Sequence, residues 1–210
     1  MPTLEILGVP FSNYVRSVRM LCEEKGVSYT LNPLLPQCDE IKAIHPAGQV
    51  PCMRHGDVTL FESKAIATYI DRVFPGPRFI PDEPEAGAKV EQWVSFGNVK
   101  VDRWIMREFV VPSVFFDKAK GPDTARIAAA LPEIEKVCAA LDKAVAGTGY
   151  LVGNSLTYAD MNVLPMLNTF GGFPQGAETL AKFPSLQAYA AKLSERPSFQ
   201  RTAPPPRAKK

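Results

Sequence analysis

The segment His45–Tyr69, HPAGQVPCMRHGDVTLFESKAIATY, decides the fold that this 210-residue sequence predicts. It opens with a turn and continues as an extended run, Val50–Met53. A second extended run, Val58–Phe61, follows a turn at His55–Asp57, and a Gly-Asp turn between two such runs is typical of a β-hairpin. An abrupt helix start at Glu62–Ser63 comes directly afterwards. We therefore expect strand, turn, strand and helix in this order.

Two features of the same segment predict a binding site. Pro51 stands at the start of a strand, so it either lies on a sheet edge or follows a cis bond that presents the backbone of Val50 to a partner other than a strand. We expect the cis bond. Glu62–Ser63 can be a plain helix start, but the amides of a helix N-terminus, with a hydroxyl among them, also form a site for a carboxylate. A ligand with amide and carboxylate groups, such as a peptide, suits this place.

The residues before this segment predict a βαβ unit. Strands are expected at Thr3–Leu7 and Val27–Leu31. Between them, Ser12 or Asn13 can cap a helix that stops at Gly26. Strand, helix and strand at this spacing imply a parallel pair joined by a right-handed crossover. The order βαβ and then ββα is that of a thioredoxin-like domain.

The residues beyond Glu85 carry almost no strand signal, and their apolar positions recur at helical spacing. Thr157 and Asp160 resemble a capping box at the start of one of these helices. A last helix is expected to end near Arg196–Pro197. We accordingly expect a first domain at 1–76, a linker at 77–84, an all-helical domain at 85–203 and a disordered tail at 204–210.

Composition excludes several classes of function. The 24 basic and 22 acidic residues nearly cancel, so we expect no nucleic-acid or membrane-surface partner. The first residues lack a signal peptide, and no apolar run is long enough to span a membrane. The four cysteines have no CxxC spacing, which favours reduced thiols in a cytoplasmic protein, and no metal site is expected. His45 and His55 lie in polar turns, where we expect solvated side chains.

The motif Gln49-Val50-Pro51 followed by Glu62-Ser63 resembles the glutathione-binding signature of the glutathione transferases, especially the serine-type phi and theta-like branches. The resemblance implies an α/β thioredoxin-like N-terminal domain followed by an all-α helical C-terminal domain. It also implies that the backbone of Val50, before cis-Pro51, pairs with the cysteinyl part of glutathione. Glu62 and Ser63 would hold its γ-glutamyl carboxylate and amino group.

The turn between the first strand and first helix is where a thioredoxin-like frame places its reactive group. This turn contains no cysteine, and Leu7-Gly8 stands where tyrosine-type transferases carry their tyrosine. The serine-type pattern remains, with Ser12 matching the catalytic hydroxyl. Such a hydroxyl would donate a hydrogen bond to the sulfur of glutathione and, with the helix dipole, favour the thiolate. Asn13 and Tyr14 are rival donors, and Ser12 can also be a helix cap alone.

Other contacts with the substrates are expected from less specific signals. A basic side chain, Lys42 or Lys64, is the candidate for the glycine carboxylate of glutathione. An apolar pocket for the second substrate can use aromatic side chains, although aromatic residues at helical spacing more often belong to a core. The pocket candidates are Phe11, Trp104, Phe109 and Phe115.

The sequence thus predicts a cytoplasmic, homodimeric glutathione transferase that activates the glutathione thiol for attack on small hydrophobic electrophiles in detoxification. Glutathione is a substrate in this reading, and no metal is involved. Dimerisation is implied by the resemblance alone. Two alternatives stay open: a non-catalytic glutathione-binding or regulatory protein of the same fold, and a specialised glutathione-dependent peroxidase, isomerase or dehalogenase.

Overall fold

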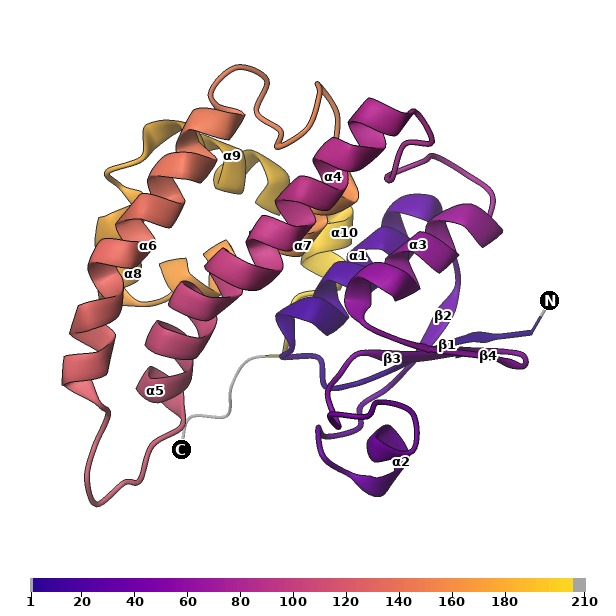
Figure 1. Cartoon of the computed structure of the whole chain (residues 1–210), viewed down its shortest axis with the longest axis horizontal. Coiled ribbons are helices and arrows are strands. Elements are labelled where there is room, and N and C mark those ends of the chain that lie inside the picture. The colour runs from indigo at the N-terminus through magenta and orange to yellow at the C-terminus, as the bar shows by residue number, and fades with distance from the viewer. Residues whose placement is uncertain (1, 206–210) are drawn as a thin grey trace. The chain divides into compact units, whose positions relative to one another are not determined.

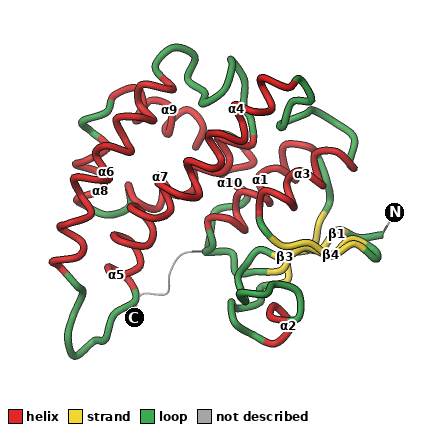
Figure 2. The backbone as a smooth tube through the Cα atoms, viewed as in Figure 1, coloured by secondary structure: helices red, strands yellow, loops and turns green. Residues whose placement is uncertain are grey.

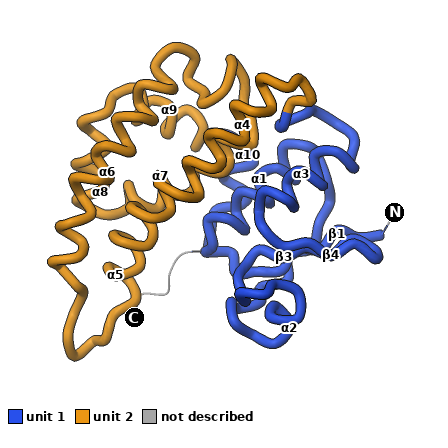
Figure 3. The backbone as a smooth tube through the Cα atoms, viewed as in Figure 1, with its two compact units in different colours: residues 1–80, 195–210 blue, residues 81–194 orange. Residues whose placement is uncertain are grey.

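The computed structural model describes residues 2–205 and contains two compact units. The first unit consists of the residues up to Ile80 together with those from Glu195 onward, and the second is Pro81–Ser194 (Figure 3). No helix among the described residues is both long enough and apolar enough to cross a bilayer.

The first unit is built on a four-stranded sheet in the order β2-β1-β3-β4 (Figure 2). Strand β1 pairs in parallel with β2 and antiparallel with β3, which in turn pairs antiparallel with β4. The thioredoxin-like βαβ and ββα order expected from the sequence is therefore confirmed. The strands are β1 (Leu4–Leu7), β2 (Tyr29–Asn32), β3 (Cys52–His55) and β4 (Val58–Phe61).

The helices of the first unit cover both sides of this sheet. Helices α1 (Asn13–Lys25) and α3 (Ser63–Val73) lie on one side, and the short α2 (Asp39–Lys42) lies on the other (Figure 1). Helix α1 begins after Ser12 and ends at Gly26, whose φ of 67° suits a glycine and whose N–H donates to carbonyls of the last turn. Both ends of α1 follow the caps that the sequence predicts.

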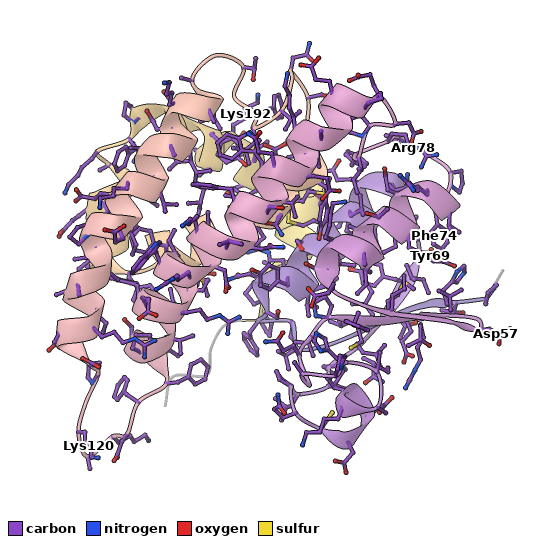
Figure 4. All side chains as sticks on the ribbon, in the orientation of Figure 1. Asp57, Tyr69, Phe74, Arg78, Lys120 and Lys192 are labelled. Atoms are coloured by element: carbon purple, nitrogen blue, oxygen red, sulfur yellow. The ribbon has the colours of Figure 1, made fainter. Side chains whose placement is uncertain are left out.

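The paired part of the hairpin lies two residues later than the sequence pattern suggested. Strand β3 begins at Cys52, because the peptide bond between Val50 and Pro51 is cis and these two residues precede the ladder. The loop joining β3 to β4 consists of Gly56 and Asp57. Figure 4 shows Asp57 at its tip.

Gly8 allows three segments to meet at one end of the sheet. Its φ is 147°, which side-chain-bearing residues rarely adopt. A Cβ atom built on Gly8 would lie 2.6 Å from Cγ2 of Val15, in the first turns of α1, and 2.9 Å from Cβ of Val50. The end of β1, the start of α1 and the loop before β3 can approach this closely only without a side chain at position 8.

A buried ion pair between α1 and α3 holds residues 77–80 against the rest of the first unit. Nζ of Lys25 lies 3.2 Å from Oδ1 of Asp71, with both side chains fully buried. The carboxylate also accepts hydrogen bonds from the backbone N–H groups of Phe79 and Ile80, and Lys25 donates to the carbonyl of Pro77. Residues 77–80, expected as linker, are therefore fastened to α1 and α3.

The C-terminal helix α10 (Pro197–Arg201) belongs to the first unit, although the sequence reading assigned residues through 203 to the helical domain. Nε and Nη2 of Arg196 each donate to the Glu24 carboxylate over 2.7 Å, and Ser198 donates to it as well. Arg16 donates to the carbonyl of Phe199 and lies over its ring. These contacts span more than 170 residues, so local sequence patterns do not reveal them. Of the tail expected at 204–210, residues 206–210 lie outside the described residues.

The second unit contains helices only, as expected. One departure from the simple helical pattern is that α4 continues directly into a π-helix, η1, which is wider than an α-helix. The elements are α4 (Pro84–Phe96), η1 (Gly97–Val110), α5 (Val111–Val114), α6 (Thr124–Val145), α7 (Tyr158–Gly171), α8 (Pro174–Leu180) and α9 (Pro184–Ser194).

The capping box at the start of α7 is confirmed. The Asp160 carboxylate accepts from the backbone N–H of Thr157 at 2.8 Å, from Leu151 N–H at 2.9 Å and from the Tyr189 hydroxyl at 3.2 Å. Burial raises the pKa of Asp160, against the effect of these hydrogen bonds. Asp160 therefore connects the loop before α7 to α9 as well as capping α7.

The close approach at Gly8 predicts that Gly8→Ala destabilises the first unit. A methyl group there must displace Val15 or Val50 from a packed position and adopt an unfavourable φ, at a cost of about 1–3 kcal/mol. Chemical denaturation would measure it. Gly26→Ala is the matched control, because φ there is 67° but no atom lies within 4 Å of the new Cβ. An equal loss in both variants would show that backbone strain, and not crowding, accounts for the effect.

The Glu24–Arg196 contact predicts a pH-dependent stability. Burial works to raise the pKa of Glu24, but hydrogen bonds from Arg196 and Ser198 outweigh it and lower the pKa. The carboxylate therefore stabilises the fold fully above its unfolded pKa of about 4.3, and this contribution is lost as pH falls through the lower folded value. Glu24→Gln should lower the free energy of unfolding by about 1–2 kcal/mol at pH 7.

Urea unfolding of wild type and Glu24→Gln at pH 7 and at decreasing pH would measure this difference, which should close under acid conditions. Glu40→Gln serves as the control, because its ion pair with Arg54 is largely exposed and contributes little. A difference that persists unchanged at low pH would contradict the assignment.

Candidate functional site

Strand register brings the three predicted parts of the site to one place. Cys52, the residue after cis-Pro51, pairs with Leu7 of β1 and with Phe61 of β4. The chain leaves Leu7 through Gly8 toward the Ser12 turn, and leaves Phe61 directly into Glu62–Ser63. The Ser12 turn, the Val50–Pro51 loop and the start of α3 therefore converge at the same end of the sheet.

Ser12 stands at the N-cap of α1. Its Oγ accepts a hydrogen bond from the backbone N–H of Val15 at 3.4 Å, and its own N–H donates to the carbonyl of Val9 at 3.1 Å. A serine hydroxyl has one hydrogen to donate and two lone pairs to accept with. Because the cap uses a lone pair, the hydroxyl hydrogen can still be donated to a ligand. Capping and ligand activation are therefore compatible roles for this residue.

Packing and a hydrogen bond fix the position of the Val50–Pro51 loop. The Val50 side chain packs against a buried cluster that includes Leu7 and Cys52. The turn before it is fixed by Gln37, whose side-chain amide donates to the carbonyl of Ala47 at 2.8 Å. Gln49 itself is exposed. This packing leaves the Val50 backbone just beyond the last residue pair of the β1–β3 ladder.

Glu62 has an unusual backbone conformation where α3 begins. Its φ is 67°, a region that costs a non-glycine residue about 1–3 kcal/mol and is often found where ligands bind. Its side chain is 64% exposed, whereas Ser63 is buried at the first turn of the helix. The backbone amides of that turn and the Glu62 carboxylate thus offer both signs of charge at one point, which suits a ligand carrying a carboxylate beside an amine.

The two lysines differ in their surroundings. Lys42 is exposed at the end of α2. Nζ of Lys64 donates to Oγ1 of Thr68, one turn further along α3, at 2.9 Å. Neither arrangement tests a contact with a glycine carboxylate, so both lysines stay candidates.

The four aromatic pocket candidates differ in how far their side chains are buried. Phe11, in the turn before α1, is 50% exposed, and Phe115 is 75% exposed. Trp104 is partly buried in η1. Phe109 is 1% exposed and meets the rings of Phe170 and Phe173 edge to face. Phe109 is therefore part of the core and not an exposed pocket residue.

Both histidines are buried, and the expectation of solvated side chains is wrong. His45 is 5% and His55 is 8% exposed. Nδ1 of His55 lies 2.9 Å from the Tyr69 hydroxyl, and the ring packs against Phe74, both residues from α3 and its end (Figure 4). Turn-like sequence around each histidine gave no sign that the rings of Phe61, Tyr69 and Phe74 would lie against it.

Cysteine chemistry is not favoured at this site. Cys52 is fully buried, and burial raises its pKa to about 11, so it is a protonated thiol at neutral pH and a poor nucleophile. Among residues 2–205, no three His, Cys, Asp or Glu side chains lie close enough to hold a metal ion.

Gly8 and His45 are two residues of this region that the sequence reading did not assign. Gly8 sits where three segments meet, and its only sequence signal is its place directly after a strand. His45 contacts Glu62 from the turn before the loop, with Nε2 3.6 Å from Oε1. A contact across seventeen positions of sequence has no local signal.

Comparison with known proteins gives the family. The family model for the glutathione S-transferase N-terminal domain matches residues 6–78, and that for the C-terminal domain matches residues 106–201. Glutathione S-transferase 3 of Zea mays is 29% identical over 98% of both chains. A stringent starvation protein A homolog of Haemophilus ducreyi is 25% identical over 90% of this chain and 84% of its own.

A solved structure agrees with the two family models. The theta-class glutathione S-transferase from the citrus canker pathogen Xanthomonas axonopodis pv. citri, with glutathione bound, has a TM-score of 0.82 at 28% identity, covering 97% of this chain and 98% of its own. The two domain models together match well over half of the sequence. The enzyme class and the serine-type resemblance expected from the sequence are thereby confirmed, and the chain belongs to the glutathione S-transferase family.

Proposed function

We propose that this protein binds glutathione where the Ser12 turn, the Val50–Pro51 loop and the start of α3 converge, and transfers it to small hydrophobic electrophiles. The convergence set by the pairing of Cys52 with Leu7 and Phe61 is the observation that supports this most strongly. The groups that support the proposal are the Ser12 hydroxyl, the backbone of Val50 in the loop before β3, and the N-terminus of α3. These three groups match the thiol, the amide and the carboxylate of a tripeptide.

In this proposal glutathione lies along the loop before β3. The backbone of Val50, supported by Gln49 and cis-Pro51, pairs with the cysteinyl residue of the ligand. Ser63 and the first amides of α3 bind the γ-glutamyl carboxylate, and Glu62 binds the amino group beside it. Lys42 and Lys64 are the proposed partners of the glycine carboxylate.

Ser12 then activates the thiol by donating a hydrogen bond from its hydroxyl to the sulfur, while the thiol proton passes to water. This bond favours the thiolate over the thiol, and the dipole of α1 adds to the effect. A free thiol has a pKa of about 8.5, and lowering it by about two units requires roughly 3 kcal/mol. One charge-assisted hydrogen bond and a helix dipole are of that size. Asn13 and Tyr14, in the same turn, are the alternative donors.

The thiolate attacks the electrophile with its free electron pair. A carbon–sulfur bond forms, and the leaving group departs with the electrons of its own bond to carbon. Apolar side chains favour an electrophile that is itself poorly hydrated. Phe11, Trp104 and Phe115 are the proposed contacts, each still open to a ligand in its own unit.

The remaining parts of the proposal concern assembly and location. We propose a homodimer, supported by the resemblance and by two apolar side chains, Val58 and Phe61, that stay exposed on the edge strand β4. Sedimentation velocity would measure the mass in solution. We place the protein in the cytoplasm, because its four cysteines are all free thiols. Cell fractionation would test that location.

A glutathione-binding protein without turnover is the second candidate. It would use the same binding residues, and one relative of this chain is a stringent starvation protein A homolog, not a protein named as a transferase. We favour the enzyme because the Ser12 hydroxyl, which caps α1 as an acceptor, keeps its hydrogen for donation to a thiol. Turnover therefore separates the two candidates.

The first test measures the ionisation of bound glutathione by thiolate ultraviolet absorbance against pH. The wild type should ionise the thiol about two units below its free pKa, and Ser12→Ala should raise that pKa by roughly one to two units. Ser12→Thr is the matched control, because it keeps the hydroxyl for both the cap and the donor. A shift that survives Ser12→Ala would assign activation to Asn13, Tyr14 or the helix amides.

The second test measures turnover with aryl halides, unsaturated aldehydes and organic peroxides near pH 6.5. The wild type should conjugate at least one class, and Ser12→Ala should be slower by roughly tenfold, in proportion to its smaller thiolate fraction. Glutathione bound without any turnover across the panel would favour the non-catalytic protein. Turnover of peroxide alone would indicate a specialised peroxidase.

A further inference from the structure

His45 is a buried side chain that faces the predicted ligand site without being part of it. It precedes the Val50–Pro51 loop and is 5% exposed. Its Nδ1 accepts a hydrogen bond from the backbone N–H of Ala47 at 3.0 Å. The ring also lies against Phe61, the last residue of β4, with 4.9 Å between the centroids. The imidazole is therefore fixed in orientation from two sides.

This hydrogen bond determines what the other ring nitrogen offers. A nitrogen that accepts from an N–H group carries a lone pair, so in the neutral ring the hydrogen is on the opposite nitrogen. That nitrogen, Nε2, lies 3.6 Å from Oε1 of Glu62. The distance is longer than a hydrogen bond, but an N–H group near a carboxylate attracts it electrostatically.

Glu62 needs such a support. Its side chain is 64% exposed, and a long exposed carboxylate samples several rotamers unless something holds it. Its backbone is already held at a φ of 67°, which sets the direction in which the side chain leaves the chain. The buried ring of His45 is a rigid group from a neighbouring turn that restricts the remaining freedom.

We propose that His45 is a positioning residue, which holds the Glu62 carboxylate in place for the amino group of the γ-glutamyl part of glutathione. The inference rests on the proposed function, because it assumes that Glu62 binds this amino group. His45 itself touches neither the thiol nor the electrophile. Its effect should therefore appear in the affinity for glutathione and in no later step.

Two substitutions distinguish the roles of the two ring nitrogens of His45. In His45→Asn, the side-chain oxygen can still accept from Ala47 N–H, as an asparagine does two residues before such a group, but nothing reaches Glu62. In His45→Gln, the longer side chain places an N–H donor near the position of Nε2. The first variant keeps the turn and loses the support, and the second retains a donor for Glu62.

Two ligands then separate positioning from folding. One is glutathione, and the other is its analogue without the α-amino group, glutaryl-cysteinylglycine. Isothermal titration calorimetry of the full chain gives both dissociation constants. Ordering one flexible side chain changes affinity by roughly three- to tenfold. His45→Asn should weaken the binding of glutathione by this factor and leave the dissociation constant of the analogue unchanged. His45→Gln should bind glutathione almost as tightly as the wild type.

A double substitution tests whether His45 acts through the Glu62 carboxylate. In a Glu62→Gln background the carboxylate is absent, so His45→Asn should have no further effect on glutathione affinity. An equal loss for both ligands, or the same loss in the Glu62→Gln background, would overturn the inference and assign His45 to the folding of the turn. No loss in His45→Asn would overturn it as well.

Failure of the proposed function gives a different result. If the wild type binds glutathione and the analogue equally, Glu62 does not contact the amino group, and the inference fails while glutathione binding stands. If the wild type binds neither ligand, the proposed function fails and the inference with it. Thiol ionisation in the wild type and His45→Asn complexes should be the same, because the inference gives His45 no contact with the thiol.

Discussion

One position in the sheet, Cys52, determines where the Ser12 turn, the Val50–Pro51 loop and the start of α3 meet. Its pairing with Leu7 on one side and Phe61 on the other places three chain segments at a common end. A shift of the register by one residue would turn the buried Cys52 side chain to the opposite face and separate these segments. The absence of a side chain at Gly8 then allows the close approach that the register requires. The chemistry of the site thus depends on packing in the sheet.

Local signals predicted where helices begin and end in both units. Ser12 and Gly26 stand at the ends of α1 as caps, and Thr157 with Asp160 opens α7, because capping uses hydrogen bonds between residues only a few positions apart. Ser12, Pro51, Glu62 and Ser63 were predicted as site residues for the same reason, since each lies in a short motif at or beside the end of an element, and their roles in binding stay predictions. Register and close approach follow from those elements once they pair.

Contacts between residues far apart in the chain could not be predicted from local sequence patterns. The Glu24–Arg196 pair joins two ends of the chain, so the last helix was assigned to the wrong unit. His45 was expected in solvent because it stands in a turn, but the ring of Phe61, in β4, lies against it. A periodic apolar pattern also cannot distinguish the α-helix α4 from the π-helix η1, since both bury one face.

The positive φ of Glu62 has a consequence for protein engineering. With φ 67° and ψ 116°, Glu62 lies outside the left-handed helical region that asparagine tolerates, so glycine is the residue that would relieve strain and raise thermal stability at position 62. A selection for heat resistance would therefore favour an exchange that removes the carboxylate. Stabilised variants of this fold should be sought with position 62 held fixed, and with their ligand affinity screened alongside their melting temperature.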